Sequence, residues 1–277
     1  MAKLELASTH ESSEIIRSTC YMYASIWACT FIVDGFRHSD GPWNYTVIYQ
    51  SHDSPSFGVK YTYDGNVPLP VEDPVLIDVG CFGKEVTKDK SDLVAAISAL
   101  SPDILWFSGD QTYEHDNLQY GVLELVYTTA SLSRNIPTLV SIDDHDYGLG
   151  NVYGAGTNQV TSYLSGEGYT IGSYCEMRAI ERLSLAHMPD PAFPDLHLLQ
   201  SGMKAWFGEY YYSDRISFAI IESRKFKKNL DPACTNVDTC TDNQYNRDGP
   251  LLGTEQEMWL ENWAKNRSDR VRVVLSE

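Results

Sequence analysis

Residues 74–110 read PVLIDVGCFGKEVTKDKSDLVAAISALSPDILWFSGD, an apolar run, a helical pattern and a second apolar run in succession. The two apolar runs are short and almost continuous, which is typical of strands that are buried on both faces. Between them, Leu93, Ile97 and Leu100 follow the spacing of one helix face. A strand, a helix and a strand in this order predict a mostly parallel sheet covered by helices.

The alternation of strands and helices continues toward the C-terminus. PTLVSIDDHD, residues 137–146, is a third buried strand with a strongly polar end. Further elements are predicted at these places: a helix from Asn117 to about Leu132, adjacent strands at 208–214 and 216–223, a helix from Thr254 and a strand at 271–276. We therefore predict an α/β fold.

The segment before residue 74 has a different character. Residues 19 to about 73 are rich in aromatic and β-branched side chains, separated by Gly, Pro, Asp and Ser, which predicts strands only. The apolar run from Tyr21 to Val33 is too short to span a bilayer and reads as one buried strand. VPLPVEDP, with three prolines in eight residues, reads as a connector. We expect a small β-sandwich-like domain at 1–73 and an α/β domain at 74–277.

Composition excludes several classes of protein. The 21 Lys and Arg residues face 38 Asp and Glu residues, so the formal net charge is −17. Such a field repels nucleic-acid backbones, and we do not expect a general nucleic-acid binder. No strand is followed by G-x-G-x-x-G or G-x-x-x-x-G-K-[ST], which argues against a nucleotide-binding fold. We identify no transmembrane segment, and the polar first residues, MAKLELASTHESSE, do not resemble a secretory signal.

The six cysteines do not fix the redox compartment. Four lie in apolar segments, where a buried free thiol is the commonest state: Cys20, Cys29, Cys81 and Cys175. Cys234 and Cys240 are close enough in a polar loop to form a disulfide, and the sequence leaves that pairing open. The compartment and the oligomeric state stay open as well.

Groups suited to metal binding follow three successive predicted strands. Cys81 follows the first strand, Asp110 and Tyr113 follow the second, and the third ends in Asp-Asp-His-Asp at 143–146. Because ligands of parallel α/β sheets bind at the carboxyl ends of strands, these side chains should face one crevice. Carboxylates, an imidazole, a phenol and a thiol together suit a polyvalent metal ion.

Each group also has a simpler explanation. Cys81 alone would more often be a small buried hydrophobe, and Gly109-Asp110 could be an ordinary turn after a strand. The run at 143–146 favours a metal site more strongly, because adjacent carboxylates repel one another unless a cation or several donors offset their charge.

The order of the motifs resembles the metal-dependent phosphoesterases of the alkaline phosphatase D (PhoD-like) family. The resemblance covers about residues 75–277 and rests on these motifs: Gly80-Cys81, G-D-x-x-Y at 109–113, D-D-H-D at 143–146, Asn151 in GNVYG, His187-Met-Pro-Asp-Pro, FAIIESRKFK at 218–227 and LLGTEQEMWL at 251–260. The preceding β segment is similar to the small N-terminal domain of such proteins. The resemblance implies a metallophosphoesterase sandwich of two sheets flanked by helices.

The resemblance also implies a dinuclear metal centre. Asp110 would bridge the two ions, and Cys81 and Tyr113 would bind an iron ion in the ferric state. Asp144 and Asn151 would bind the second ion, calcium or another divalent ion.

Two further residues would act on the substrate. His145 would protonate the leaving oxygen or hold the phosphate, and Arg224 would pair with phosphate oxygens. A salt bridge from Arg224 to a structural carboxylate is the alternative.

The activity that the resemblance implies is hydrolysis of phosphate monoesters or diesters, with a small phosphate ester as substrate. The family resemblance also suggests an extracytoplasmic or secreted location. The family carries a further aspartate/histidine ligand motif beyond a later strand, whereas this sequence stops at Glu277. We therefore expect a truncated member with little activity. The alternative is a catalytically impaired or non-catalytic relative that binds a ligand or partner through the same crevice.

Overall fold

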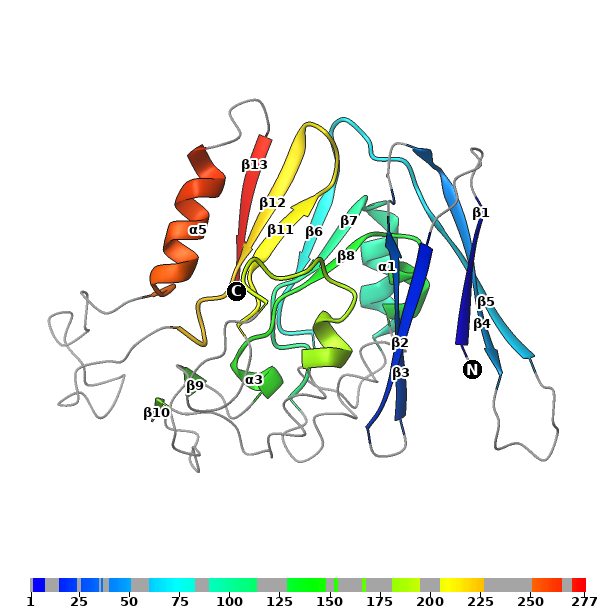
Figure 1. Ribbon diagram of the computed structural model, residues 1–277, viewed down its shortest axis with the longest axis horizontal. Helices are drawn as coiled ribbons and strands as arrows, with labels where there is room; N and C mark the ends of the chain where they lie inside the picture. Colours follow the sequence, from blue (N-terminus) through cyan, green and yellow to red (C-terminus); the bar gives the residue numbers. More distant parts are fainter. Residues whose placement is uncertain are drawn as a thin grey trace, which may run out of the picture. The chain divides into compact units, whose positions relative to one another are not determined.

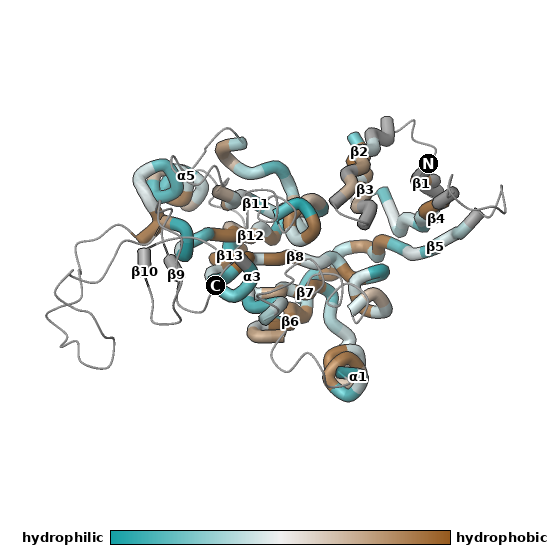
Figure 2. Tube along the Cα trace, turned by 90° about the horizontal axis from the view of Figure 1, so that it is seen from below, coloured by the Kyte–Doolittle hydropathy of each residue, from teal (hydrophilic) through white to brown (hydrophobic). Residues whose placement is uncertain are grey.

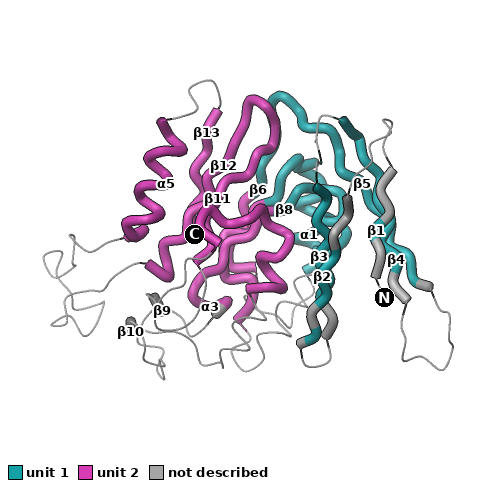
Figure 3. Tube along the Cα trace, in the orientation of Figure 1, with its two compact units in different colours: residues 1–77, 90–105, 128–138 teal, residues 78–89, 106–127, 139–277 magenta. Residues whose placement is uncertain are grey.

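The structure, a computed structural model, divides into two compact units (Figure 3). Unit 1 contains residues 1–77, 90–105 and 128–138, and unit 2 contains residues 78–89, 106–127 and 139–277. The structure describes these residues: 2–7, 15–23, 26–34, 36, 40–50, 60–82, 90–113, 129–147, 152–153, 166–167, 181–194, 205–226, 251–265 and 271–277. The predicted domain boundary between residues 73 and 74 stays a prediction.

Unit 1 is built mainly from antiparallel strands (Figure 1). Its strands are β1 (Ala2–Ala7), β2 (Ile15–Tyr23), β3 (Ile26–Asp34), β4 (Trp43–Gln50) and β5 (Lys60–Val67). β4 lies between β1 and β5 in a three-stranded sheet, and β2 pairs with β3 in a separate two-stranded sheet. Gly65 faces Tyr45 across this sheet, where any Cβ would collide with the Tyr45 ring.

Two expectations for the N-terminal part are wrong. The apolar run from Tyr21 to Val33 is not one buried strand, because it crosses from β2 into β3, and Met22 and Ile32 are 59% and 43% exposed. Cys20 and Cys29 are not free thiols: they face each other across the β2–β3 pair and form a disulfide. Cys175, Cys234 and Cys240 lie outside the described residues.

Unit 1 also contains helix α1 (Ser91–Ala99) and the helical residues 129–133. Of the predicted apolar positions of α1, Ile97 is buried, whereas Leu93 and Leu100 are exposed. The Tyr45 hydroxyl donates to the Arg134 carbonyl oxygen at 2.5 Å, and the Asn66 N–H donates to the Asn135 side chain at 3.0 Å. These bonds attach the segment after the predicted helix at 117–132 to β4 and β5. The first twelve residues of that predicted helix lie outside the described residues.

The strands predicted at the two apolar runs and at PTLVSIDDHD are present. β6 (Leu76–Val79), β7 (Ile104–Phe107) and β8 (Thr138–Val140) form a sheet in the order β6-β7-β8, and all three are mostly brown in the hydropathy view of Figure 2. All four β7 residues are buried, as expected of a strand covered on both faces. The residues that follow these strands belong to unit 2.

A second sheet of unit 2 has the order β11-β12-β13. β11 (Gly208–Tyr211) and β12 (Ile216–Ile221) are adjacent, as predicted, and they pair antiparallel, while β13 (Val271–Ser276) runs parallel to β12. Every residue of β12 is buried. Unit 2 also contains α3 (Asp144–Tyr147), α5 (Thr254–Lys265) and the short parallel pair β9 (Val152–Tyr153) and β10 (Gly166–Glu167).

Helix α5 fixes the carboxyl end of β12. Gln256, fully buried, accepts a hydrogen bond from the Glu222 N–H and donates one to the Glu222 carbonyl, both at 2.8 Å. Trp263 on the same helix donates to Glu209 of β11 at 2.7 Å. Because a buried backbone group must be paired, the Gln256 side chain takes the place of a neighbouring strand at Glu222.

A buried ion-pair cluster follows directly after β12. Lys225, 1% exposed, lies 2.9 Å from Glu222 and 3.5 Å from Glu181. Burial would lower the pKa of Lys225, but the two carboxylates outweigh it and raise that pKa. Burial raises the pKa of Glu222 to about 7, although Lys225 opposes this shift. The cluster holds the turn that carries Arg224.

The architecture is therefore mixed α/β, with several small sheets and few helices, in agreement with the predicted class. Among the described residues, we find no helix with the length and apolar character needed to cross a bilayer.

Gly109 should tolerate no side chain. Its φ is +122°, and a Cβ there would lie 2.5 Å from the Asp143 Cβ. We expect Gly109→Ala to lower the free energy of unfolding by about 2 kcal/mol or more, since strain and overlap add. Urea denaturation measures this. Gly80→Ala is the control, because its new Cβ meets only the Ser108 hydroxyl, at 3.0 Å, and should cost clearly less. Equal losses for both variants would contradict the steric argument.

Glu222 should give the protein a measurable pH dependence. Its folded pKa, about 7, lies above the ordinary value of 4.5, so the folded state binds more protons between those values. The free energy of unfolding should therefore fall as pH rises through this window. We expect Glu222→Gln to flatten that fall in denaturation curves from pH 5 to pH 8. Glu261→Gln, which removes an exposed carboxylate whose pKa is lowered by Lys265, should leave it unchanged.

Candidate metal centre

The ends of β6, β7 and β8 meet at one edge in unit 2. The Ser108 N–H donates to the Val79 carbonyl at 3.3 Å, and the Ser141 N–H donates to the Phe107 carbonyl at 2.8 Å. Beyond these bonds, the Cys81 N–H reaches the Gly109 carbonyl at 3.1 Å. Residues that follow different strands are thereby placed side by side.

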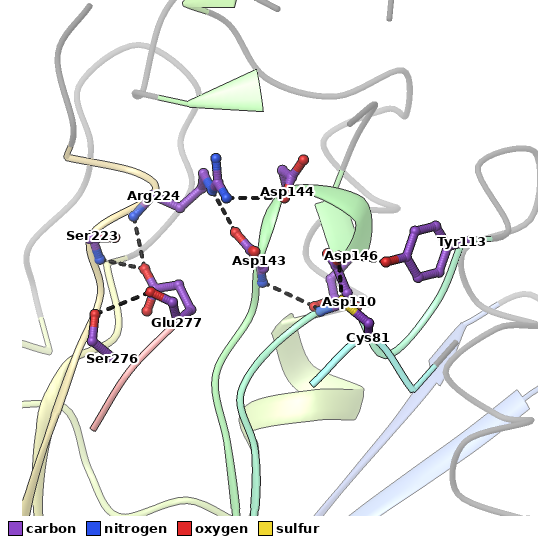
Figure 4. Close-up of polar contacts among 10 residues, drawn as sticks. All are labelled: Cys81, Asp110, Tyr113, Asp143, Asp144, Asp146, Ser223, Arg224, Ser276 and Glu277. Carbon is purple, nitrogen blue, oxygen red and sulfur yellow. Dashed lines mark hydrogen bonds and ion pairs between the residues drawn. The ribbon is translucent and has the colours of Figure 1, made fainter. Parts of the chain in front are cut away.

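The backbone is strained where the strands end. Cys81 and Asp110 have φ values of 53° and 58°, and Gly109 has 122°. Non-glycine residues rarely adopt positive φ, and such strain clusters at functional sites. Gly109 allows the end of β7 to approach Asp143 closely, which no other residue would permit. The left-handed conformation at Cys81 and Asp110 turns both side chains toward the same edge (Figure 4).

Three predicted metal ligands contact one another. The Tyr113 hydroxyl donates to Asp110 Oδ2 at 2.7 Å, and the Cys81 thiol lies 3.6 Å from the same oxygen. Burial and then the hydrogen bonds with Cys81 and Asp110 raise the pKa of Tyr113. The phenol therefore stays protonated beside the carboxylate in this state. Cys81 is exposed and not the buried hydrophobe of the simpler explanation.

Asp144 and His145 lie at the same edge. His145 stacks on Tyr113, with ring centroids 4.1 Å apart. Asp110, Asp143 and Asp144 each offer an oxygen within 4.8 Å of the others. Asp110 and Asp144 are 7% and 5% exposed, so the group is largely removed from water.

The donors present fit a metal ion. Asp110 Oδ1 is buried and has no hydrogen-bond partner within the part of the chain that the structure describes. A buried carboxylate oxygen without a partner is costly, and a cation would satisfy it. The Cys81 thiol and the Tyr113 phenol lie against Oδ2 of Asp110, and Asp143 and Asp144 offer further carboxylate oxygens nearby. That set matches the preferences of two different ions.

Asp146 was not among the predicted site residues. It is 1% exposed, and its carboxylate accepts bonds from three backbone N–H groups, those of Asp110 at 2.9 Å, Asp143 at 3.0 Å and Thr112 at 3.1 Å. Burial raises its pKa well above the ordinary value against the effect of these donors. The sequence shows that D-D-H-D contains an acid at its fourth position, but it does not show that this acid is the one buried beneath the site.

Arg224 reaches the site from the turn after β12. Its Nε lies 2.5 Å from Asp143 Oδ1, and its Nη2 lies 3.3 Å from Asp144 Oδ1. Glu277, after β13, accepts hydrogen bonds from the N–H groups of Ser223 and Arg224 at 2.5 and 2.9 Å. Asp143 belongs to the polar run that was predicted to face this edge, although no role was assigned to it, whereas Glu277 was not predicted to act here. Arg224 thus forms salt bridges with two carboxylates of the acidic cluster.

The structure places five of the seven predicted residues together with Arg224 at their rim: Cys81, Asp110, Tyr113, Asp144 and His145. The remaining one, Asn151, lies outside the described residues. So do Glu114, His115 and Asp116, which follow Tyr113 in the sequence and to which the resemblance assigns no ligand role.

Comparisons with known proteins bear on the fold of the chain. No protein-family model matches the chain, and no curated protein matches it. Among solved structures, the structure of PhoD matches 90% of the chain and 49% of its own, with 16% identity and a TM-score of 0.57. The structure of purple acid phosphatase PPD1 from yellow lupin (Lupinus luteus) seeds matches all of this chain and 46% of its own, with 10% identity and a TM-score of 0.54.

The chain thus spans about half the length of these two solved structures. At such low identity the likeness concerns the fold. The chain has a PhoD-like metallophosphoesterase fold.

Proposed function

We propose that this protein is a metal-dependent phosphoesterase that hydrolyses phosphate monoesters or diesters through a dinuclear metal centre. In class it is a phosphoric ester hydrolase of the alkaline phosphatase D type. The proposal includes a finer fold arrangement, in which two sheets form a sandwich flanked by helices. The likeness of the chain to the solved structures of PhoD and of a purple acid phosphatase supports the assignment to the phosphoesterases.

The observation that carries the proposal is the position of Asp110. One oxygen of this buried carboxylate faces the Tyr113 hydroxyl and the Cys81 thiol, and the other is buried without a partner among the described residues. Asp143 and Asp144 offer oxygens nearby. A carboxylate between a thiol–phenol pair and further carboxylates is suited to bridge two unlike ions.

In this proposal, Cys81 and Tyr113 hold a ferric ion, and Asp144 and Asn151 hold calcium or another divalent ion. When bound, the two ions would generate the nucleophile and neutralise charge on the attacking and leaving oxygens. His145, fixed against the Tyr113 ring, donates a proton to the leaving oxygen or binds the phosphate.

Arg224 binds phosphate oxygens through its guanidinium group, which favours planar, two-point contacts with such anions. The substrate is a small phosphate ester. The formal net charge of −17 does not oppose this, since bound cations and Arg224 dominate the local field.

Asp110→Asn tests whether the Asp110 carboxylate, unlike other acids of the chain, is needed for both metal binding and activity. The amide keeps the shape of the side chain but binds cations weakly, so bound metal and activity should fall together, by tenfold or more. Elemental analysis of the purified protein and hydrolysis of p-nitrophenyl phosphate measure the two quantities. Asp214→Asn, the same change at an exposed turn, is the control and should alter neither. If Asp116→Ala strips the metal while Asp110→Asn keeps it, the assignment of the G-D-x-x-Y motif is wrong.

Tyr113→Phe tests the iron position separately from activity. A phenolate bound to ferric iron absorbs visible light, and phenylalanine cannot form that bond. We expect iron-loaded protein to be coloured and the variant to lose the visible band, while far-UV circular dichroism stays the same. A non-catalytic relative with no metal would show no band in either protein. A band that survives in Tyr113→Phe would remove Tyr113 from the ligand set.

A further inference from the structure

Unit 1 contains an open pocket of about 510 Å³ near the start of β4 and the end of β5. Its walls come from two parts of the chain, the β4–β5 pair and the segment that follows the helical residues 129–133. The lining residues include Pro42, Asn44, Asp64, Asn66, Arg134 and Asn135. None of these residues belongs to the candidate metal centre, so the proposed function gives this pocket no role.

Hydrogen bonds join the two walls of the pocket. The Asn66 N–H donates to Asn135 Oδ1 at 3.0 Å. The Tyr45 hydroxyl donates to the Arg134 carbonyl at 2.5 Å, and the Arg134 guanidinium group donates to the Asp64 carbonyl. The segment at 134–135 is thus attached to both strands, and the pocket lies within one hydrogen-bonded part of unit 1.

The lining is rich in amide groups. Asn44 and Asn66 lie directly opposite each other in the β4–β5 register, so their side chains leave the same face of the sheet. The next pair on that face is Thr46 and Asp64, in which the Thr46 hydroxyl donates to Asp64 Oδ1 at 2.7 Å. Asn135 adds a third amide, whose Oδ1 accepts from the Asn66 backbone and whose NH₂ group is a donor. Donors and acceptors therefore alternate around the pocket.

The charges of the lining residues balance. Asp64 carries one negative charge, Arg134 carries one positive charge, and the three asparagines carry none. The Arg134 guanidinium group is engaged within unit 1, because it donates to the Asp64 carbonyl and lies over the Tyr63 ring, with Cζ 4.2 Å from the ring centroid. The formal net charge of −17 disfavours an anion as well. A neutral, strongly hydrogen-bonding ligand therefore suits the pocket best.

We propose that this pocket of unit 1 binds a neutral carbohydrate, whose hydroxyl groups pair with the three amides and with the Asp64 carboxylate. A sugar hydroxyl both donates and accepts, so it needs the two kinds of partner side by side, as amide groups provide them. Pro42, which is exposed, offers an apolar ring to the C–H groups of a sugar. The volume of the pocket lies within the range of about 300–1,000 Å³ that is usual for small-molecule sites. Carbohydrate binding here is independent of the candidate metal centre.

An array of immobilised neutral and sulfated oligosaccharides, followed by calorimetric titration with the best neutral oligosaccharide, tests the site. We expect the purified protein to bind neutral oligosaccharides, with the same affinity in the presence of a metal chelator. Asn44→Ala and Asn66→Ala should each weaken this binding about three- to tenfold, since each removes hydrogen bonds to the sugar. Asn66→Ala keeps the wall of the pocket, because the bond to Asn135 comes from the backbone. Asn262→Ala, the same change at an exposed position of α5, is the control and should leave binding unchanged.

Three other results would overturn carbohydrate binding at this pocket. If the protein binds only sulfated oligosaccharides, the pocket is an anion site at Arg134. If neutral oligosaccharides bind but Asn44→Ala and Asn66→Ala bind them as tightly as Asn262→Ala does, or the chelator abolishes binding, the sugar lies elsewhere. If no oligosaccharide binds, the pocket is only a feature of the surface. Each of these results leaves the proposed phosphoesterase function to be decided by Asp110→Asn and Tyr113→Phe.

Discussion

A single buried carboxylate organises the candidate metal centre. Asp146 receives the backbone N–H groups of Asp110, Thr112 and Asp143, so it ties the residues after β7 to the residues after β8. Without this acceptor, three buried N–H groups would lack partners, and each unpaired group would cost about 1–3 kcal/mol. The positions of Asp110 and Asp143 relative to each other follow from these three bonds.

The strain of the strand ends has to be maintained by such contacts. Cys81 and Asp110 adopt positive φ, which is unfavourable for residues with a side chain. The bonds from Cys81 to Gly109 and from Asp110 to Asp146 hold these conformations. The result is a rim in which a thiol, a phenol and carboxylates lie together at the strand ends.

Local patterns in the sequence predict the buried strands and the edge at which the candidate site lies. The apolar runs at β6, β7 and β8 predicted buried strands, and the polar residues after each strand predicted a common edge. The segments that form β11 and β12 were predicted to be adjacent strands, and they pair. Cys81, Asp110, Tyr113 and Asp144 were therefore identifiable as a group without coordinates, although their roles as ligands remain a proposal.

Other features depend on long-range geometry that no local pattern contains. Within D-D-H-D, nothing in the order of the letters shows that Asp146 turns inward while Asp143 faces Arg224. Glu277 lies more than fifty residues from the turn that it holds. The antiparallel pairing of β2 with β3 was missed because the two strands together look like one continuous apolar run, and the facing of Cys20 and Cys29 follows only from that pairing.

The two hydrogen bonds between the Gln256 side chain and the backbone of Glu222 limit which insertions and deletions this protein can tolerate. An α-helix advances about 100° per residue, so one inserted or deleted residue before Gln256 in α5 would turn its carboxamide away from β12. Both backbone groups of Glu222 would then lose their partner, and the turn that carries Arg224 would lose its support. Insertions near the start of α5 should therefore be tolerated far less well than substitutions on its exposed face.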